Sequence, residues 1–126
     1  NGKYLRYNGK MLTTTFEPPP PPDAISVNPE YYVFTTSGGL EEVATVTCSK
    51  AGIPSNFSAS VTSDPQSIIE ELVTTSGSSG DTIWVNVIVN STYHSACASA
   101  TITLTCGDAS CELIIYQDGY VGECEF

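Results

Sequence analysis

The chain has 126 residues and a mass of 13.4 kDa, which is the size of a single domain with one core. Its 4 Lys+Arg against 14 Asp+Glu give a formal charge of −10, and this acidity disfavours nucleic acid and anionic membrane surfaces as partners. Ser and Thr fill 30 positions while only 14% of residues are charged, a composition typical of β-rich extracellular or virion-surface domains and not of helical cytosolic enzymes.

The N-terminal segment has the opposite charge to the rest of the chain. Residues 1–22 carry a net charge of +2 and residues 23–126 a net charge of −12. Asn8-Gly9, which suits both central positions of a type I′ turn, lies between two short β-prone runs and predicts a hairpin. Because an isolated hairpin is marginally stable in water, we expect residues 1–16 to be a docking peptide for a larger protein assembly, with a disordered terminus as the alternative. The candidate docking residues are Tyr4, Leu5, Arg6, Tyr7, Lys10, Met11 and Leu12.

A proline-rich linker is expected over residues 17–23. The five consecutive prolines from Pro18 to Pro22 favour a polyproline II rod, which rises about 3.1 Å per residue and therefore spans roughly 15 Å. We expect this linker to hold the docking peptide away from the domain that follows.

Residues 24–120 are predicted to form one all-β domain, because short β-prone runs alternate with turn residues and no stretch supports an amphipathic helix of three turns. Seven or eight strands in about a hundred residues predict an immunoglobulin-like β-sandwich, followed by a C-terminal tail over residues 121–126. The predicted strands are 24–27, 31–35, 43–48, 57–61, 68–73, 82–89, 99–106 and 111–117.

The last two strands form the hairpin with the clearest register. In residues 99–106 the even positions are apolar and the odd positions are Ser or Thr, so the even positions are predicted to face the core. A four-residue loop over 107–110 predicts that Leu104 lies opposite Leu113 and that Cys106 lies opposite Cys111. Cys106 and Cys111 are therefore candidates for a disulfide bond.

The remaining cysteines and the single histidine do not form a recognisable catalytic or metal-binding pattern. Five cysteines is an odd number, so at least one stays free or pairs between chains, and Cys48 and Cys97 are expected to be small buried thiols. No Cys-x-x-Cys occurs, and His94 is expected to be a loop residue that lacks the partner needed to activate Cys97. We therefore expect no cofactor, no metal and no enzymatic activity.

Aromatic side chains supply the candidate binding site. A sugar-binding surface needs exposed rings beside hydroxyl or amide groups. Strand alternation puts Trp84 and Asn86 on the less apolar side of one strand, and Thr103 and Tyr116 on the outer side of the last hairpin. One outer surface lined by all four residues is the predicted glycan site; in the competing interpretation, Trp84 packs under a loop or between the sheets. Secondary candidates are Tyr31, Tyr32 and Tyr93.

Short runs at both ends of the predicted domain share a pattern with a known family. The first runs are Ile25-Ser26-Val27-Asn28-Pro29, Tyr32-Val33-Phe34 and Gly38-Gly39 before the strand 43–47. The later runs are residues 85–90, the strand 100–104 and the closing Ile115-Tyr116-Gln117-Asp118-Gly119. Together they resemble BACON domains, the immunoglobulin-like modules common in Bacteroidetes proteins.

The resemblance implies a non-catalytic module with proposed binding to carbohydrate or mucin glycoprotein, and similar domains also occur in bacteriophages of gut Bacteroidetes. A basic docking peptide, a stiff linker and an acidic head are typical of a capsid-decoration or appendage protein. We therefore expect an extracellular module on a virion or cell surface, anchored by residues 1–16, whose head adheres to glycans. The alternatives are a structural spacer without a glycan ligand and an accessory module of a secreted glycan-degrading system. No apolar run approaches the roughly 18 residues of a membrane-spanning helix, so membrane insertion is not expected.

Overall fold

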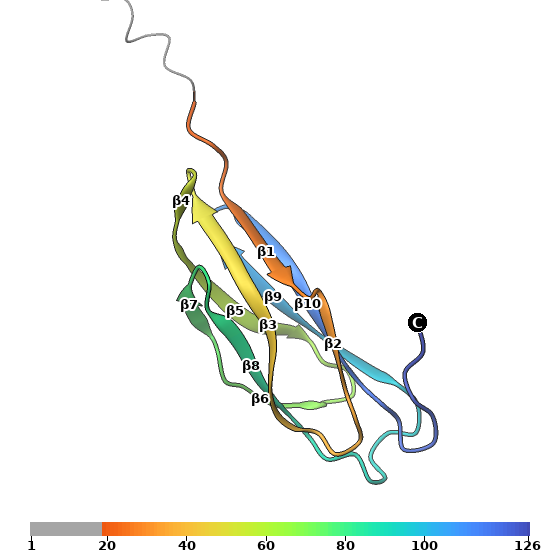
Figure 1. Ribbon diagram of the computed structural model, residues 1–126. Helices are drawn as coiled ribbons and strands as arrows, with labels where there is room; N and C mark the ends of the chain where they lie inside the picture. The colour runs from red at the N-terminus through yellow and green to blue at the C-terminus, as the bar shows by residue number, and fades with distance from the viewer. Residues whose placement is uncertain (1–18) are drawn as a thin grey trace, which may run out of the picture.

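The computed structural model describes residues 19–126, which form two β-sheets around a shared core (Figure 1). The first sheet contains, in spatial order, β1 (Ala24–Asn28), β3 (Gly39–Lys50), β8 (Thr82–Val87) and β6 (Ile69–Leu72), with β4 (Ile53–Pro54) beside the end of β3. The second sheet contains β2 (Tyr31–Phe34), β10 (Ala109–Gln117), β9 (Ala98–Cys106), β5 (Asn56–Ser63) and β7 (Ser76–Ser78). The predicted all-β fold is confirmed, and within this part of the chain no helix is long and apolar enough to cross a membrane. The predicted docking peptide, residues 1–16, lies outside the described residues.

Each of the eight predicted strands coincides with a strand of the structure, but the described residues contain ten. The two additional strands, β4 and β7, have two and three residues and lack the apolar alternation that marks the others. The strand β3 begins at Gly39, four residues before the predicted start. The prediction missed this first part because a bulge between Glu42 and Ala44 interrupts the alternation of the strand. Periodicity alone therefore finds only the regular half of this strand.

Alternating apolar residues in the long strands fill the space between the two sheets. In β9 every even residue from Ala98 to Cys106 is buried, as predicted. Burying one Leu or Ile side chain stabilises the fold by about 1.5–3 kcal/mol, so this inner layer dominates the stability of the sandwich. The largest fully buried apolar side chains come from both sheets and the segment before β6: Val43, Val46, Ile68, Ile83, Val85, Val87, Ile102, Leu104, Leu113 and Ile115.

The β9–β10 hairpin has the predicted faces but not the predicted register. Cys106 pairs with Ala109 and Leu104 with Cys111, so every pair is displaced by two residues from the prediction. The loop is a two-residue turn in which Gly107 adopts a φ of 59°, a conformation that glycine accepts without steric cost. A displacement of two residues keeps each side chain on its face, which is why the core-facing set is correct although the pairing is not.

Asp23 fastens this turn to a second turn at the same end of the sandwich. Its carboxylate accepts the N–H of Asp108 at 2.8 Å and the N–H of Ala51 at 3.0 Å. These two backbone donors lower the pKa of Asp23 from its ordinary value, because they stabilise the ionised carboxylate. The residue just before β1 therefore joins the β9–β10 turn to the turn between β3 and β4.

The cysteines pair differently from the prediction. Cys97 forms a disulfide with Cys124, whereas Cys106 and Cys111 are both free, because the two-residue displacement of the hairpin register separates them. The expectation that Cys97 is a buried thiol is also wrong, since it lies exposed in the loop before β9. Cys48 is buried as predicted and donates to the Ser55 carbonyl oxygen at 3.0 Å. Burial, together with the neighbouring Cys106, raises the pKa of the Cys48 thiol, which disfavours its reactive thiolate.

Candidate functional site

The four residues predicted to share one surface lie on opposite faces of the sandwich. Trp84 and Asn86 project outward from β8 in the first sheet. Thr103 and Tyr116 project outward from β9 and β10 in the second sheet. The predicted four-residue site is therefore not formed, because the sheets pack by their inner faces and each keeps a separate outer face. Tyr93, a secondary candidate, lies in the exposed loop between β8 and β9.

Trp84 is an outward-facing residue and not part of the core. It keeps 39% of its surface open to solvent, and its backbone N–H donates to the Thr74 hydroxyl at 3.0 Å. The competing interpretation, in which Trp84 packs under a loop or between the sheets, is therefore wrong.

Tyr116 belongs to an exposed aromatic cluster on the second sheet. We define this aromatic cluster as Tyr31 of β2, Tyr116 of β10 and Phe126 of the C-terminal segment. The ring centroid of Tyr116 lies 6.0 Å from that of Tyr31 and 4.7 Å from that of Phe126, and the centroids of Tyr31 and Phe126 are 5.3 Å apart. Tyr31 is 49% exposed and Phe126 is 75% exposed, so the cluster offers apolar ring surface to the solvent.

Hydroxyl groups cover the part of this outer face formed by β5 and β9. Thr103, one of the predicted site residues, shares a hydrogen bond of 2.8 Å with the hydroxyl of Thr62 on β5. Ser58 and Thr105 share another of 2.7 Å one step along the same two strands. The outward-facing Ser and Thr residues of the two strands are Ser58, Ser60, Thr62, Ser99, Thr101, Thr103 and Thr105. The aromatic cluster thus stands beside a polar sheet face whose exposed Glu112 on β10 lies opposite Thr103.

The C-terminal segment that supplies Phe126 is fixed to the loop between β8 and β9. The Cys97–Cys124 disulfide joins the two, with their Cα atoms 4.8 Å apart. Tyr120 and Val121 donate their N–H groups to two carbonyl oxygens of this loop, each at 3.1 Å. Gly119 approaches the loop so closely that a Cβ there would collide with the Ser95 carbonyl group, so only glycine fits. The predicted tail, residues 121–126, is therefore part of the folded head.

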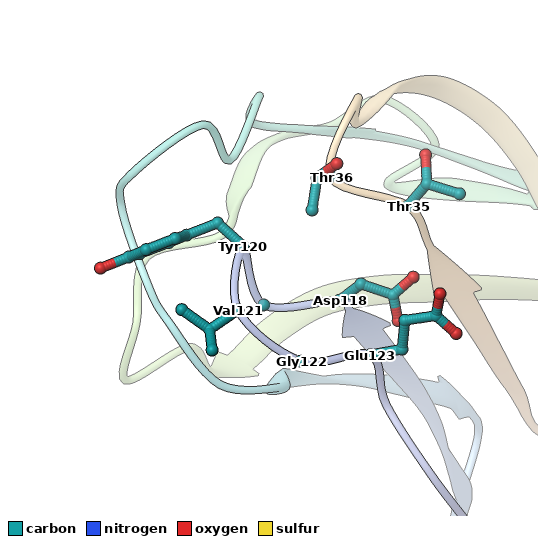
Figure 2. A pocket seen from close by; sticks show the side chains of 8 residues that line it. Thr35, Thr36, Asp118, Tyr120, Val121, Gly122 and Glu123 are labelled. Atoms are coloured by element: carbon teal, nitrogen blue, oxygen red, sulfur yellow. The ribbon is translucent and has the colours of Figure 1, made fainter.

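A hollow of about 350 Å³ lies where β2 and β10 end (Figure 2). Its polar side chains include the carboxylates of Asp118 and Glu123 and the hydroxyls of Thr35 and Thr36, all labelled in Figure 2. Asp118 also accepts the N–H of Cys124 at 2.8 Å, which shapes the turn. The complete lining is Thr35, Thr36, Asp118, Gly119, Tyr120, Val121, Gly122 and Glu123. Among residues 19–126, no three metal-binding side chains come together.

The hollow and the aromatic cluster are built from the same three segments. Both use β2, β10 and the C-terminal segment, and Thr35 follows Tyr31 by four residues along an extended chain, which is about 13 Å. We take the carboxylate and hydroxyl oxygens of the hollow together with the exposed rings of the cluster as the candidate site. It has acceptors for hydroxyl groups and an apolar surface for a ring.

A buried hydrogen-bond network holds the loops around the hollow. Gln117 is fully buried and donates to the carbonyl oxygens of Thr35 at 3.2 Å and Ile88 at 2.7 Å. The Oε1 atom of Gln117 therefore faces the Nε2 atom of His94 at 2.9 Å. Because an amide oxygen can only accept, Nε2 donates the proton of this hydrogen bond. Asn90, also fully buried, accepts the N–H of His94 and donates to the carbonyl oxygen of Asp118. His94 is thus a structural loop residue, as predicted.

Two members of the aromatic cluster were not apparent from the sequence. Tyr31 was only a secondary candidate, because its position beside Tyr116 depends on the parallel pairing of β2 with β10, which connects residues about eighty positions apart. Phe126 falls in the segment, residues 121–126, for which the sequence predicts a tail. The odd number of cysteines was the one feature of the sequence that could have pointed to the position of Phe126, since it left open which cysteine pairs with Cys97.

Comparison with known proteins supports the fold and identifies no family. The sequence matches no protein-family model and no curated protein. Among solved structures, the fold is similar to part of a Bacteroides ovatus GH5 xyloglucanase in complex with a XXXG heptasaccharide, with a TM-score of 0.58 and 17% sequence identity. The match covers 77% of this chain and 19% of that chain, so the chain spans about a fifth of the enzyme.

Proposed function

We propose that residues 24–120 form an immunoglobulin-like sandwich of the BACON type. Such sandwiches have strands A, B, E and D in one sheet and C, F and G in the other. Assigning β1, β3, β8 and β6 to A, B, E and D, and β5, β9 and β10 to C, F and G, gives the same neighbours. The parallel pairing of β2 with β10 then corresponds to strand A crossing to the second sheet, which also supports the proposal.

We infer that the chain is a non-catalytic, surface-displayed module whose head binds carbohydrate. The observation that carries this proposal is the exposed aromatic cluster of Tyr31, Tyr116 and Phe126. Sugar rings have apolar C–H faces that pack on aromatic rings, and their hydroxyl groups need donors and acceptors nearby. Asp118, Glu123 and the Thr hydroxyls of the hollow supply them at the other end of the site.

The geometry and the charge favour the end or a single unit of a neutral glycan. The ring of Tyr116 is inclined by 80° to that of Tyr31 and by 70° to that of Phe126, so the cluster is a corner and not a flat floor for a long chain. Residues 19–126 contain one Lys, Lys50, and no Arg, so sulfated or carboxylated glycans find repulsion from the acidic surface and few positive partners. Neutral sugars suffer no such penalty.

A binding role without catalysis is supported by the state of the two residues that most resemble a nucleophile and its base. Cys97 is bonded to Cys124 and has no thiolate to offer. His94 directs its Nε2 atom to Gln117 inside the buried network. The pairs Glu41-Glu42 and Glu70-Glu71 are exposed and lie in the other sheet, away from the candidate site.

The proposal is tested by binding of the full chain to an array of neutral glycans, followed by calorimetry on any hit. The XXXG heptasaccharide bound by the similar xyloglucanase is the first ligand to test. We expect Tyr116→Ala and Tyr31→Ala each to weaken binding about tenfold or more, since an aromatic contact at the centre of a site often supplies that much. Tyr93→Ala, which removes an exposed tyrosine outside the cluster, is the control and should bind like the wild type.

Two results would contradict the carbohydrate proposal. One is the absence of binding to every neutral glycan when the chain is displayed in many copies, which compensates for weak single sites. The other is binding that survives loss of both tyrosines. Either result favours the alternative, a structural spacer or decoration domain without a glycan ligand.

A further inference from the structure

The outer face of the first sheet carries a second exposed apolar patch, which is separate from the aromatic cluster. Val73, which follows β6, donates its N–H to the Trp84 carbonyl oxygen on β8, and Leu40 on β3 lies opposite Asn86, two residues along β8 from Trp84. The side chains of Trp84, Leu40 and Val73 are 39%, 53% and 48% exposed, respectively. We define the Trp84 face as Leu40, Glu42, Glu71, Val73, Trp84 and Asn86.

The Trp84 face is also acidic. Glu42 lies opposite Trp84 on β3 and accepts the Thr82 hydroxyl at 2.7 Å, and Glu71 lies opposite Asn86 on β6. The single Lys of residues 19–126, Lys50, is at the far end of β3, where it pairs with Ile53. No cation of the head therefore neutralises these carboxylates, and an apolar surface bordered by unpaired acids fits an amphipathic, basic partner.

We propose that the Trp84 face binds the N-terminal segment, residues 1–16, of a second copy of this chain. The segment holds three of the four Lys and Arg residues of the chain, and apolar or aromatic residues lie between them. Its cations are Lys3, Arg6 and Lys10, and its larger apolar residues are Tyr4, Leu5, Tyr7, Met11, Leu12 and Phe16. The charge complements Glu42 and Glu71, and the apolar residues complement Trp84. This surface and its occupant are independent of the proposed carbohydrate site.

The position of the linker favours a second copy over the same one. Ala24, the first residue of β1, pairs with Ser49, whereas Trp84 pairs with Glu42, seven residues or about 23 Å back along β3. Pro19–Pro22 leave the sandwich at the end where β4 lies (Figure 1), and the strand pairing puts Trp84 towards the other end of β3. A stiff proline rod that points outward delivers residues 1–16 to a neighbour more readily than to its own head. Because the donor and acceptor surfaces differ, the contact is head-to-tail and builds rows or rings of copies.

The single tryptophan makes the contact directly measurable, since all tryptophan emission of this chain comes from Trp84. A synthetic peptide of residues 1–16 contains no tryptophan and is titrated into dilute full-length chain. We expect the emission to move to shorter wavelength as the peptide removes water from the indole ring. A peptide with Lys3, Arg6 and Lys10 replaced by Glu should cause no shift, and high salt should weaken the response to the native peptide.

Self-association of the full chain is followed by sedimentation velocity up to about 100 μM, because contacts of this size span the micromolar range. The wild type should form larger species as concentration rises. Trp84→Ala and the full chain with Lys3→Glu, Arg6→Glu and Lys10→Glu should each shift the transition about tenfold or more towards higher concentration. Ile53→Ala is the matched control, because it removes an exposed apolar residue at the other end of the same sheet.

The proposal is overturned if the wild-type chain stays monomeric over this range and the peptide leaves the Trp84 emission unchanged. It is equally overturned if association occurs but survives both the Trp84 and the charge-reversal variants, since the contact then lies elsewhere. Neither outcome affects the carbohydrate proposal, which depends on Tyr31 and Tyr116 of the opposite sheet.

Discussion

Breaking the Cys97–Cys124 bond is predicted to destabilise the head substantially. The two cysteines are 27 residues apart in sequence, and the chain-entropy model assigns about 3.5 kcal/mol to closing a loop of that length in the unfolded chain. For a unit of roughly 110 residues, this loss corresponds to a fall of about 15 °C in melting temperature. The bond also holds the segment that carries Phe126, so glycan affinity should fall in the same variant.

The assay is urea unfolding of the wild type, with and without reductant, beside the double variant Cys97→Ala/Cys124→Ala. The reduced wild type and the double variant should agree with each other. Cys111→Ala removes a free, partly buried thiol and is the control, with an expected loss below about 1 kcal/mol. If the double variant is as stable as the wild type, the C-terminal segment is not held as described, and the reasoning about Phe126 fails with it.

Two further predictions concern polar residues that join separate turns. Asp23→Asn should lower the free energy of unfolding at pH 7, and the difference from the wild type should disappear below pH 3.8. The reason is that a carboxylate with a lowered pKa stabilises the fold above its ordinary pKa and loses that contribution as the pH falls. Urea midpoints at pH 7 and pH 3 measure this difference, and a difference independent of pH would contradict the prediction. Gln117→Glu keeps the size and the acceptor for His94 but turns the donor that serves Thr35 and Ile88 into an acceptor, so it should cost at least about 2 kcal/mol at neutral pH in the same assay. If Gln117→Glu leaves the free energy of unfolding unchanged, water replaces the hydrogen bonds of this network.

The sequence predicted the strands of the head because alternation and turn residues are local properties. Residues 99–106 and 111–117 show which side of each strand is buried, and that assignment is correct. The register between them was wrong, because a two-residue and a four-residue loop both keep the same faces together. Only the conformation of Gly107 and the anchoring of its turn by Asp23 decide between the two, and neither follows from a hydrophobic pattern.

The site was harder to predict than the fold, because it depends on which sheet each strand joins. Alternation shows that Trp84 and Tyr116 both face outward, but not that their strands belong to different sheets. The aromatic cluster needs two contacts between residues far apart in sequence: the parallel pairing of β2 with β10, and the disulfide that brings the C-terminal segment to the loop before β9. Neither contact leaves a local pattern in the chain.

The separation of the two outer faces has a consequence for how the proposed activities combine. A copy whose Trp84 face is occupied by a neighbour still presents Tyr31, Tyr116 and Phe126 on the opposite sheet. If copies associate through residues 1–16 as proposed, the proposed carbohydrate sites add up in one particle and none of them is covered. Because a single corner of three rings is a small site, its affinity for one sugar is expected to be low, and a row of such sites gains binding strength through effective concentration and not through new contacts. The proposed self-association and the proposed glycan binding can therefore act together because the Trp84 face and the aromatic cluster lie on opposite sheets.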